Sequence, residues 1–194
     1  MDLILLQPGD PSIFGGANSW QNGGSLIDNF EDVWKGFKPP SKNMGQCLEL
    51  VSVHQGMKQQ ITTDVSNSAR TSGRPIITEF TCVKYVDKTS VKLYENCLAA
   101  KPLGAGADKP TKIYIARNSG EKTANILTIE LRDAIVSEIQ FQSNPDDMPT
   151  EQFKLNFTEV LWTYTVQRAD TNTSGNLSSG WSIARNRTIG QFTP

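Results

Sequence analysis

The sequence contains little of the material from which catalytic and metal sites are usually built. Its 194 residues include one histidine, His54, and three cysteines, Cys47, Cys82 and Cys97, with no Cys-x-x-Cys pair. Zinc sites made of several histidines or paired cysteines are therefore excluded. No Gly-x-Ser-x-Gly motif marks a hydrolase nucleophile either. An odd cysteine set argues against an obligatory disulfide framework, so we expect the cysteines to be small buried hydrophobic residues.

Large charge and long apolar runs are also absent. The formal net charge is −1, which does not fit a general binder of nucleic acid or of anionic membranes. The longest apolar run, “LILL” at residues 3–6, is far too short to span a bilayer. It also lacks the basic flank and length of a signal peptide, so we expect any export to use another route.

What the chain has is a series of short alternating segments separated by turn residues. This pattern is typical of a mainly β protein, either a barrel or a sandwich. The predicted strands cover residues 3–6, 48–54, 76–85, 112–117, 126–132, 135–141 and the two halves of 149–167.

The longest of these segments changes phase in its middle. In “PTEQFKLNFTEVLWTYTVQ” the apolar residues stand on odd positions up to Phe157 and on even positions from Val160 onward. A slip of one residue at Thr158–Glu159 turns every later side chain to the opposite face. A second interruption falls at Asp133, inside an otherwise continuous strand pattern.

One helix is expected within residues 87–100, “DKTSVKLYENCLAA”. Asp87 is a good N-cap residue, and Pro102 and Gly104 follow the segment as helix breakers. We expect the helix to cover an open end of a barrel. Its predicted apolar face consists of Val91, Tyr94, Cys97 and Leu98.

Residues from about 7 to 46 differ in composition from the rest of the chain. They are rich in Gly, Asn and Pro, yet they carry five aromatic side chains, which is too many for a flexible linker. Within them, residues 25–36 have the capping and spacing of a short helix. We interpret 7–46 as an ordered insertion in a single domain, 1–194, and residues 101–110 as a surface loop.

Two polar stretches are candidates for chemistry or binding. Asp146, Asp147 and Glu151 would be the carboxylates of a hydrolase, but their setting between two prolines predicts a solvated turn. Residues 62–75 are polar and long for a hairpin connection. Connections of this length are often functional or disordered, so a mobile loop and an arm that reaches a neighbour are both left open.

Five blocks of sequence follow one another in a fixed order: “KYVDKTSVKL” (84–93), “DAIVSEIQ” (133–140), “PTE” (149–151), “WTYT” (162–165) and “SGWSI” (179–183). In the order and spacing of these blocks, from about residue 47 to residue 185, the chain resembles the haemolysin-coregulated protein (Hcp) family, the tube protein of bacterial type VI secretion. Val91 stands where the family commonly has proline at the start of its helix, and either residue can occupy a first turn. The 7–46 insertion is longer than the family's usual first connection.

The resemblance implies a small closed β-barrel of short antiparallel strands with one flanking α-helix, assembled as a homohexameric ring. Stacked rings would form a hollow tube that a contractile sheath expels, with effector proteins in the lumen and a spike protein at the tip. The protein would be cytoplasmic before firing and then secreted without a cleavable signal peptide. It would not be an enzyme, and no cofactor, metal, nucleic acid or membrane insertion is expected. The alternative is a monomeric β-barrel that binds a small ligand.

The same resemblance assigns roles to particular residues. In a ring that packs on several surfaces, the phase slip at Thr158–Glu159 is expected to be a β-bulge or sharp bend that lets one strand serve two packing environments. His54 and Ser52 are expected to face the lumen. The ring-interface or stacking loop is expected to include Thr62, Thr63, Asp64, Ser66, Arg70 and Arg74.

Overall fold

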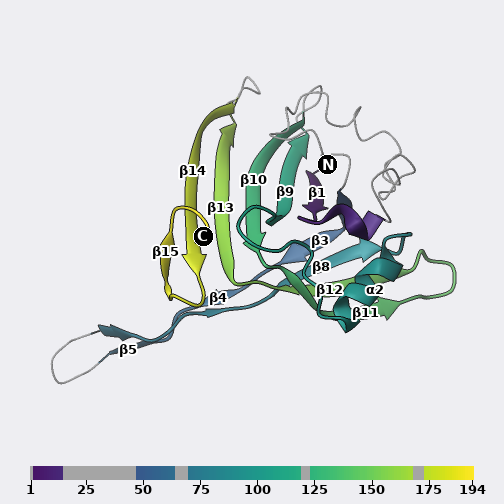
Figure 1. Ribbon diagram of the computed structural model, residues 1–194. Coiled ribbons are helices and arrows are strands. Elements are labelled where there is room, and N and C mark those ends of the chain that lie inside the picture. Colours follow the sequence, from purple (N-terminus) through teal and green to yellow (C-terminus); the bar gives the residue numbers. More distant parts are fainter. Residues whose placement is uncertain (1, 15–46, 64–69, 119–122, 168–172) are drawn as a thin grey trace.

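Two antiparallel β-sheets, one α-helix and a protruding hairpin make up the described part of the chain (Figure 1). The structure is a computed structural model. It describes residues 2–14, 47–63, 70–118, 123–167 and 173–194.

The larger sheet has seven strands in the order β15-β14-β13-β10-β9-β1-β2. Neighbouring strands are antiparallel throughout. Their bounds are Asp2–Gln7 (β1), Leu48–Leu50 (β2), Thr111–Asn118 (β9), Thr123–Arg132 (β10), Glu159–Gln167 (β13), Thr173–Ser182 (β14) and Arg187–Ile189 (β15).

The smaller sheet has four strands in the order β11-β12-β8-β3, again antiparallel. The predicted strands are found in place, but 48–54 and 76–85 each prove to be two strands that belong to different sheets. β14, β15 and the short strands within residues 57–63 and 70–72 were not among the predictions. The bounds in this sheet are Ser52–His54 (β3), Phe80–Tyr85 (β8), Ile135–Gln142 (β11) and Thr150–Asn156 (β12).

The phase slip marks a place where the chain leaves one sheet and enters the other. β12 pairs with β8 and β11 in the smaller sheet, whereas β13 pairs with β10 and β14 in the larger one. The expected sharp bend is present, but it separates two strands of two sheets. The interruption at Asp133 is the matching corner between β10 and β11, and there the backbone adopts a positive φ of 51°. The two corners touch, because the Thr158 N–H donates to the Arg132 carbonyl at 3.1 Å.

A third crossing lies between β2 and β3. Val51 separates the two strands, and its N–H donates to the Val83 carbonyl of β8 at 2.7 Å. Strands that switch sheets through bends are the usual corners of two-sheet packings.

The closed barrel predicted from the sequence is not present in the described residues. Closure requires that the first and last strands of a sheet hydrogen-bond to each other. Here the hydrogen-bonded order ends at β15 and β2 in the larger sheet and at β11 and β3 in the smaller one. The physical reason is that each corner interrupts a ladder, so the chain builds two packed layers.

The core lies between these layers and is filled by apolar side chains from both sheets. Phe80 and Phe157 stack in a tilted arrangement with ring centroids 5.5 Å apart. Cys82 also lies in this core and Cys47 is buried elsewhere, so the expectation of buried cysteines is confirmed for these two. Other fully buried members include Leu6, Leu48, Leu93, Ile113, Leu131, Phe153, Leu155 and Val160.

The helix, α2 (Ser90–Leu98), lies within the predicted segment, but its N-cap is Thr89 in place of Asp87 and it buries a different face. Leu93 is buried, whereas Val91 is 67% exposed and Leu98 is 90% exposed. The reason is that Ser90 and Asn96 are buried as polar residues, which apolar periodicity cannot detect. No helix in the described ranges is long and apolar enough to cross a membrane.

The end of α2 is closed by a pair of backbone hydrogen bonds. The Lys101 N–H donates to the Asn96 carbonyl at 2.9 Å, and the Ala100 N–H donates to the Cys97 carbonyl at 3.2 Å. This is a Schellman motif, which places the residue after the cap in the left-handed region. Ala100 occupies that position with φ 50°, so the helix ends before Pro102 is reached.

The described start of the insertion belongs to the body of the protein. A short 3-10 helix, η1 (Pro11–Phe14), places Ile13 and Phe14 in the core. The predicted helix at 25–36, and most of the 7–46 insertion, lie outside the described residues. That 1–194 is a single domain with this insertion stays a prediction.

Residues 101–110 are not simply a surface loop. Leu103 is buried and its N–H donates to the Ala134 carbonyl at 2.8 Å. Gly104 allows this close packing, since a Cβ there would lie 2.2 Å from the Lys109 carbonyl oxygen. The Leu103 carbonyl in turn accepts from the Asp10 N–H at 2.6 Å.

Candidate assembly site

A long hairpin, Met57–Ile77, projects from the body of the protein, and we call it the arm (Figure 1). The predicted polar segment 62–75 is its distal part. The tip, residues 64–69, lies outside the described residues. The arm consists of two ribbons in sequence, formed by β4 (Met57–Lys58) with β7 (Ile76–Ile77) and by β5 (Ile61–Thr63) with β6 (Arg70–Ser72).

The base of the arm is fixed to the body by polar contacts. Gly56 and Thr78 face each other: the Gly56 N–H donates to Thr78 Oγ1 at 2.8 Å, and the Thr78 N–H donates to the Gly56 carbonyl at 2.9 Å. Arg74 Nη2 donates to the Ile183 carbonyl, just after β14, at 2.7 Å. This hydrogen bond ties the base of the arm to the end of β14.

Three of the other predicted arm residues lie on β5 and β6. Thr62 is exposed and pairs with Thr71, and Thr63 pairs with Arg70. Asp64 and Ser66 lie outside the described residues. The interface or stacking role of these residues stays a prediction.

Ser52 and His54 lie on the outer face of the smaller sheet, on its edge strand β3. Ser52 pairs with Val83, and His54 pairs with Thr81. Val53 between them packs toward the core, so the two residues share the opposite face. His54 is exposed and Ser52 is half-buried, and their position relative to a lumen stays a prediction.

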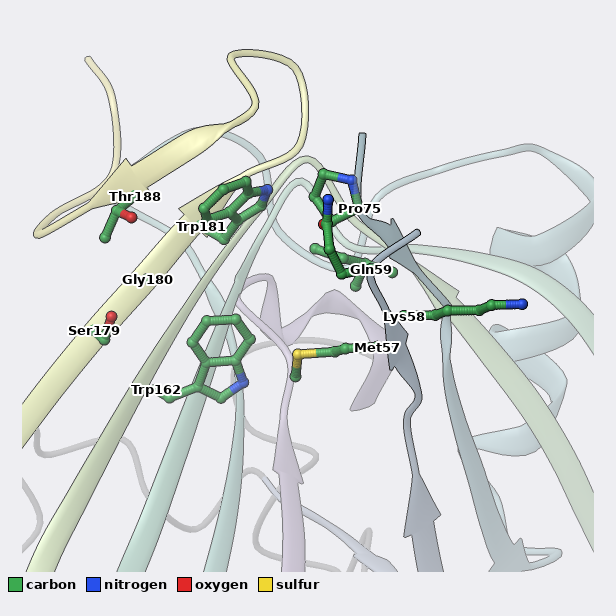
Figure 2. A pocket seen from close by; sticks show the side chains of 10 residues that line it. Met57, Lys58, Gln59, Pro75, Trp162, Ser179, Gly180, Trp181 and Thr188 are labelled. Carbon is green, nitrogen blue, oxygen red and sulfur yellow. The ribbon is translucent and has the colours of Figure 1, made fainter. Parts of the chain in front are cut away.

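A groove lies between the base of the arm and the β13–β14 pair (Figure 2). Its volume is about 420 Å³. Trp162 of β13 and Trp181 of β14 face the Met57 side chain across it, with Pro75 above (Figure 2). We call it the indole groove; its lining is completed by Lys58, Gln59, Ile77, Ser179, Gly180 and Thr188.

Sequence reasoning missed this site. Alternation placed Trp162 on a buried face, and burial in fact decreases along β13, from Val160 in the core to Tyr164 and Val166 at the surface. The available signal was the pair of tryptophans in the “WTYT” and “SGWSI” blocks. The remaining groove residues come from the arm and are brought there only by the fold.

The acidic residues considered for hydrolysis do not form one site. Asp146 and Asp147 are exposed in the turn before β12, as predicted. Glu151 is not part of that turn, because its side chain is fully buried. It pairs with Lys84 Nζ at 3.0 Å and accepts hydrogen bonds from Ser90 Oγ at 2.9 Å and Tyr94 Oη at 2.7 Å.

This buried cluster explains two of the sequence blocks. “KYVDKTSVKL” supplies Lys84 and Ser90, and “PTE” supplies Glu151. A buried charge is tolerated only when it is paired and hydrogen-bonded, so these residues must occur together. Burial, followed by the hydrogen bond and charge of Glu151, raises the pKa of Tyr94 to about 12. The cluster locks the start of α2 onto the smaller sheet.

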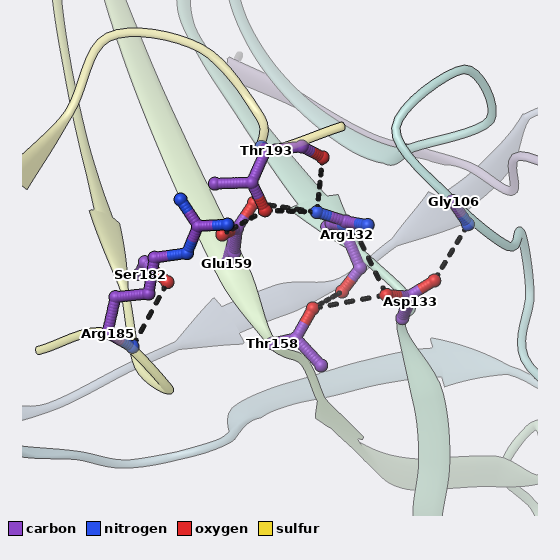
Figure 3. A network of polar contacts seen from close by, with 8 residues as sticks. All are labelled: Gly106, Arg132, Asp133, Thr158, Glu159, Ser182, Arg185 and Thr193. Carbon is purple, nitrogen blue, oxygen red and sulfur yellow. Dashed lines mark hydrogen bonds and ion pairs between the residues drawn. The ribbon is translucent and has the colours of Figure 1, made fainter.

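A second polar cluster occupies the paired corners (Figure 3). Arg132 Nη1 lies 3.2 Å from Glu159 Oε2 and also donates to Thr193. Thr193 binds Glu159 twice, through its N–H at 2.9 Å and its hydroxyl at 2.8 Å. Burial alone would raise the pKa of Glu159, but hydrogen bonds from Thr193, Ser182 and Arg132 outweigh it and lower the pKa.

Cys47 and Cys82 are not set up as nucleophiles. Burial raises the pKa of both Cys47 and Cys82 to about 12, so neither forms a thiolate readily at neutral pH. Among the residues that the structure describes, no group of three or more His, Cys, Asp or Glu side chains is placed to hold a metal ion.

Two corner-linked antiparallel sheets, one flanking helix and a protruding arm define a mainly β protein that offers surface for assembly. A family model described as “Type VI secretion system effector, Hcp” matches residues 40–164, which is more than half of the chain. The chain therefore belongs to the Hcp family of type VI secretion, as the sequence blocks predicted.

Known proteins agree with this assignment. Protein hcp1 of Pseudomonas aeruginosa is 30% identical over 112 residues, which cover 57% of this chain and 66% of that protein, just under two thirds of its length. A solved structure of a type six secretion system protein has a TM-score of 0.66 at 20% identity and covers 74% of this chain and 87% of its own. Hcp1 from Salmonella typhimurium has a TM-score of 0.61 at 16% identity, with coverage of 97% and 99%.

Proposed function

We propose that the protein is the tube subunit and effector carrier of a type VI secretion system. Six copies close into a ring, rings stack into a hollow tube, and a contractile sheath expels the tube. Membership of the Hcp family supports this proposal. The structural observation that carries it is the arm. An isolated two-stranded hairpin is marginally stable in water, so a neighbouring copy is the natural surface against which this one packs.

The same proposal covers partners and location. A sheath protein surrounds the tube, a spike protein stands at its tip, and small effector proteins bind in the lumen, where His54 and Ser52 face them. The protein resides in the cytoplasm before firing and outside the cell afterwards. Its proposed role is non-enzymatic.

The alternative of a monomeric barrel around a small ligand is not supported. It requires an enclosed cavity inside the β structure, whereas the space between the two sheets is filled by core side chains. The indole groove lies outside that space, between the arm and the edge of the larger sheet.

Light scattering on a sizing column tests the proposal. We expect a mass six times that of the 21.4 kDa chain and, in negative stain, rings with a central hole. A variant in which residues 60–73 are replaced by an Asn-Gly turn should lose tube formation at high concentration. A wild-type protein that stays monomeric at every concentration would contradict the proposed function.

A further inference from the structure

The indole groove has the composition of a protein-binding hot spot. Its floor and walls are formed by Trp162, Trp181 and Met57, and aromatic and methionine side chains are enriched where partners dock. The two tryptophans are only partly buried and extend the core outward. A groove that is open along one side, with its polar groups at the rim, suits a protruding side chain better than a small molecule, whose site is usually enclosed.

The apolar surface of this groove continues outward along the arm. Met57, Gln59 and Ile61 alternate along one strand direction and share one face of the arm. Ile61 is 60% exposed. A partner that fills the groove and also covers Ile61 must lie beside the body, under the arm. In a ring of identical subunits, that place is taken by the next copy.

The helix α2 offers a surface that fits. Val91 and Leu98 are seven residues apart and therefore lie on the same side of α2. Both are exposed, although the helix contains other residues that pack on its own sheet. Glu95 lies between them on this side and pairs with Lys92 of the same helix at 2.5 Å. Lys58 is the charged residue among those that line the groove, and across the contact it offers Glu95 a second cation.

The two surfaces lie at different ends of the molecule. In Figure 1, α2 is at the right, beside β11, and the β13–β15 end of the larger sheet is at the left. A closed ring uses head-to-tail contacts, which need two different patches on each subunit. We propose that the indole groove of one copy receives Val91 and Leu98 of the next, with Glu95 near Lys58. This inference rests on the proposed function and names the ring contact.

Single charged substitutions test each half of the contact. Leu98→Glu changes a side chain that is 90% exposed, and Met57→Glu changes one that is 59% exposed, so the fold should be retained in both. We expect each variant to run as one chain at a concentration where the wild type runs as six. Leu177→Glu is the matched control, because Leu177 is 75% exposed and lies outside the groove and α2; it should remain a ring.

Mixing the two variants gives a sharper test. Met57→Glu keeps an intact helix surface and Leu98→Glu keeps an intact groove, so one contact can form between them. The two remaining surfaces are both blocked, which prevents further growth. We expect a one-to-one complex of twice the chain mass from the mixture, and monomers from each variant alone. Far-ultraviolet circular dichroism confirms that each variant is folded.

The outcomes separate this inference from the proposed function. If the wild type forms rings and both variants also form rings, the inference is overturned and the ring is closed elsewhere. If the mixture stays monomeric while the control forms rings, the pairing of groove with helix is wrong. If the wild type itself forms no ring, the proposed function fails, and the inference fails with it.

Discussion

Lys84 and Glu151 face each other inside the protein, with Lys84 Nζ 3.0 Å from Glu151 Oε1 and side chains that are 1% and 0% exposed. Lys84 belongs to β8 and Glu151 to β12, two neighbouring strands of the smaller sheet, and Glu151↔Lys84 is a pair in their register. Ser90 Oγ accepts from Lys84 and donates to Glu151, which ties α2 to the pair.

Removal of one partner should therefore strongly lower the free energy of unfolding. Lys84→Met leaves the Glu151 carboxylate buried without its cation, and we expect a loss of about 3–5 kcal/mol in the free energy of unfolding. The double variant Lys84→Met/Glu151→Gln should be more stable than Lys84→Met, since no buried charge is left at that pair. Urea unfolding measures both. The control is Asp147→Asn, in the exposed turn, whose free energy of unfolding should stay within about 0.5 kcal/mol of wild type. If Lys84→Met changed the free energy of unfolding as little as this control does, the prediction would be contradicted.

The left-handed residue at the end of α2 offers a stabilising change. Ala100 has φ 50°, a conformation that glycine adopts without steric strain. We expect Ala100→Gly to raise the free energy of unfolding by about 0.5–1 kcal/mol, the usual gain being reduced by the greater freedom of glycine in the unfolded chain. Ala99→Gly is the neighbouring control, because Ala99 has φ −85° and gains nothing from the change. Equal effects of the two substitutions in thermal unfolding would count against the explanation.

Glu159 should make stability sensitive to acid. Its pKa in the folded protein is lowered from the ordinary value of 4.5. A lowered folded pKa means that the stabilising contribution is present above the unfolded pKa and is lost as the pH falls through the folded one. Glu159→Gln removes the titrating group, so the stability gap between wild type and variant should be widest near neutral pH. The gap should narrow as the pH falls below 4.5. Urea midpoints at one protein concentration across this range provide the measurement, and a constant gap would contradict the assignment.

Arg74 should control the direction of the arm without affecting the core. Arg74→Gln removes the hydrogen bond to the Ile183 carbonyl. We expect faster amide exchange in the described strands β5 and β6 and weaker assembly, with a thermal midpoint close to wild type because the residue is exposed. Arg187→Gln removes the same charge on β15 and is the control. Unchanged exchange in the arm of Arg74→Gln would show that the base is held by Gly56 and Thr78 alone.

The sequence predicted the strands well because their periodicity is a local property. Alternation located β12 and β13, and the phase slip between them marked a real corner at Thr158. What periodicity could not show is that the two halves enter different sheets. That outcome depends on which distant strands pair with them, and so the expected closed barrel was wrong.

The candidate site was harder to predict, for a physical reason. The arm was found from its polar composition, yet the groove beneath it combines Met57 with Trp181, residues more than a hundred positions apart. Glu151 was misassigned because a buried carboxylate and a solvated one look the same in a sequence. The burial of Ser90 in place of Val91 follows from the hydrogen bond to Glu151 and not from hydrophobicity.

Three of the crossings between the sheets run directly from one strand into the next, and these have a mechanical consequence. At Val51, Asp133 and Thr158 the backbone itself passes from one layer to the other, so a force on either sheet reaches the other along covalent bonds. Two of these crossings are tied together by the Thr158–Arg132 hydrogen bond. Sliding one layer over the other would have to stretch the chain at all three points. Direct crossings of this kind resist shear between the two sheets, the deformation that an axial push would impose on a subunit of the proposed tube.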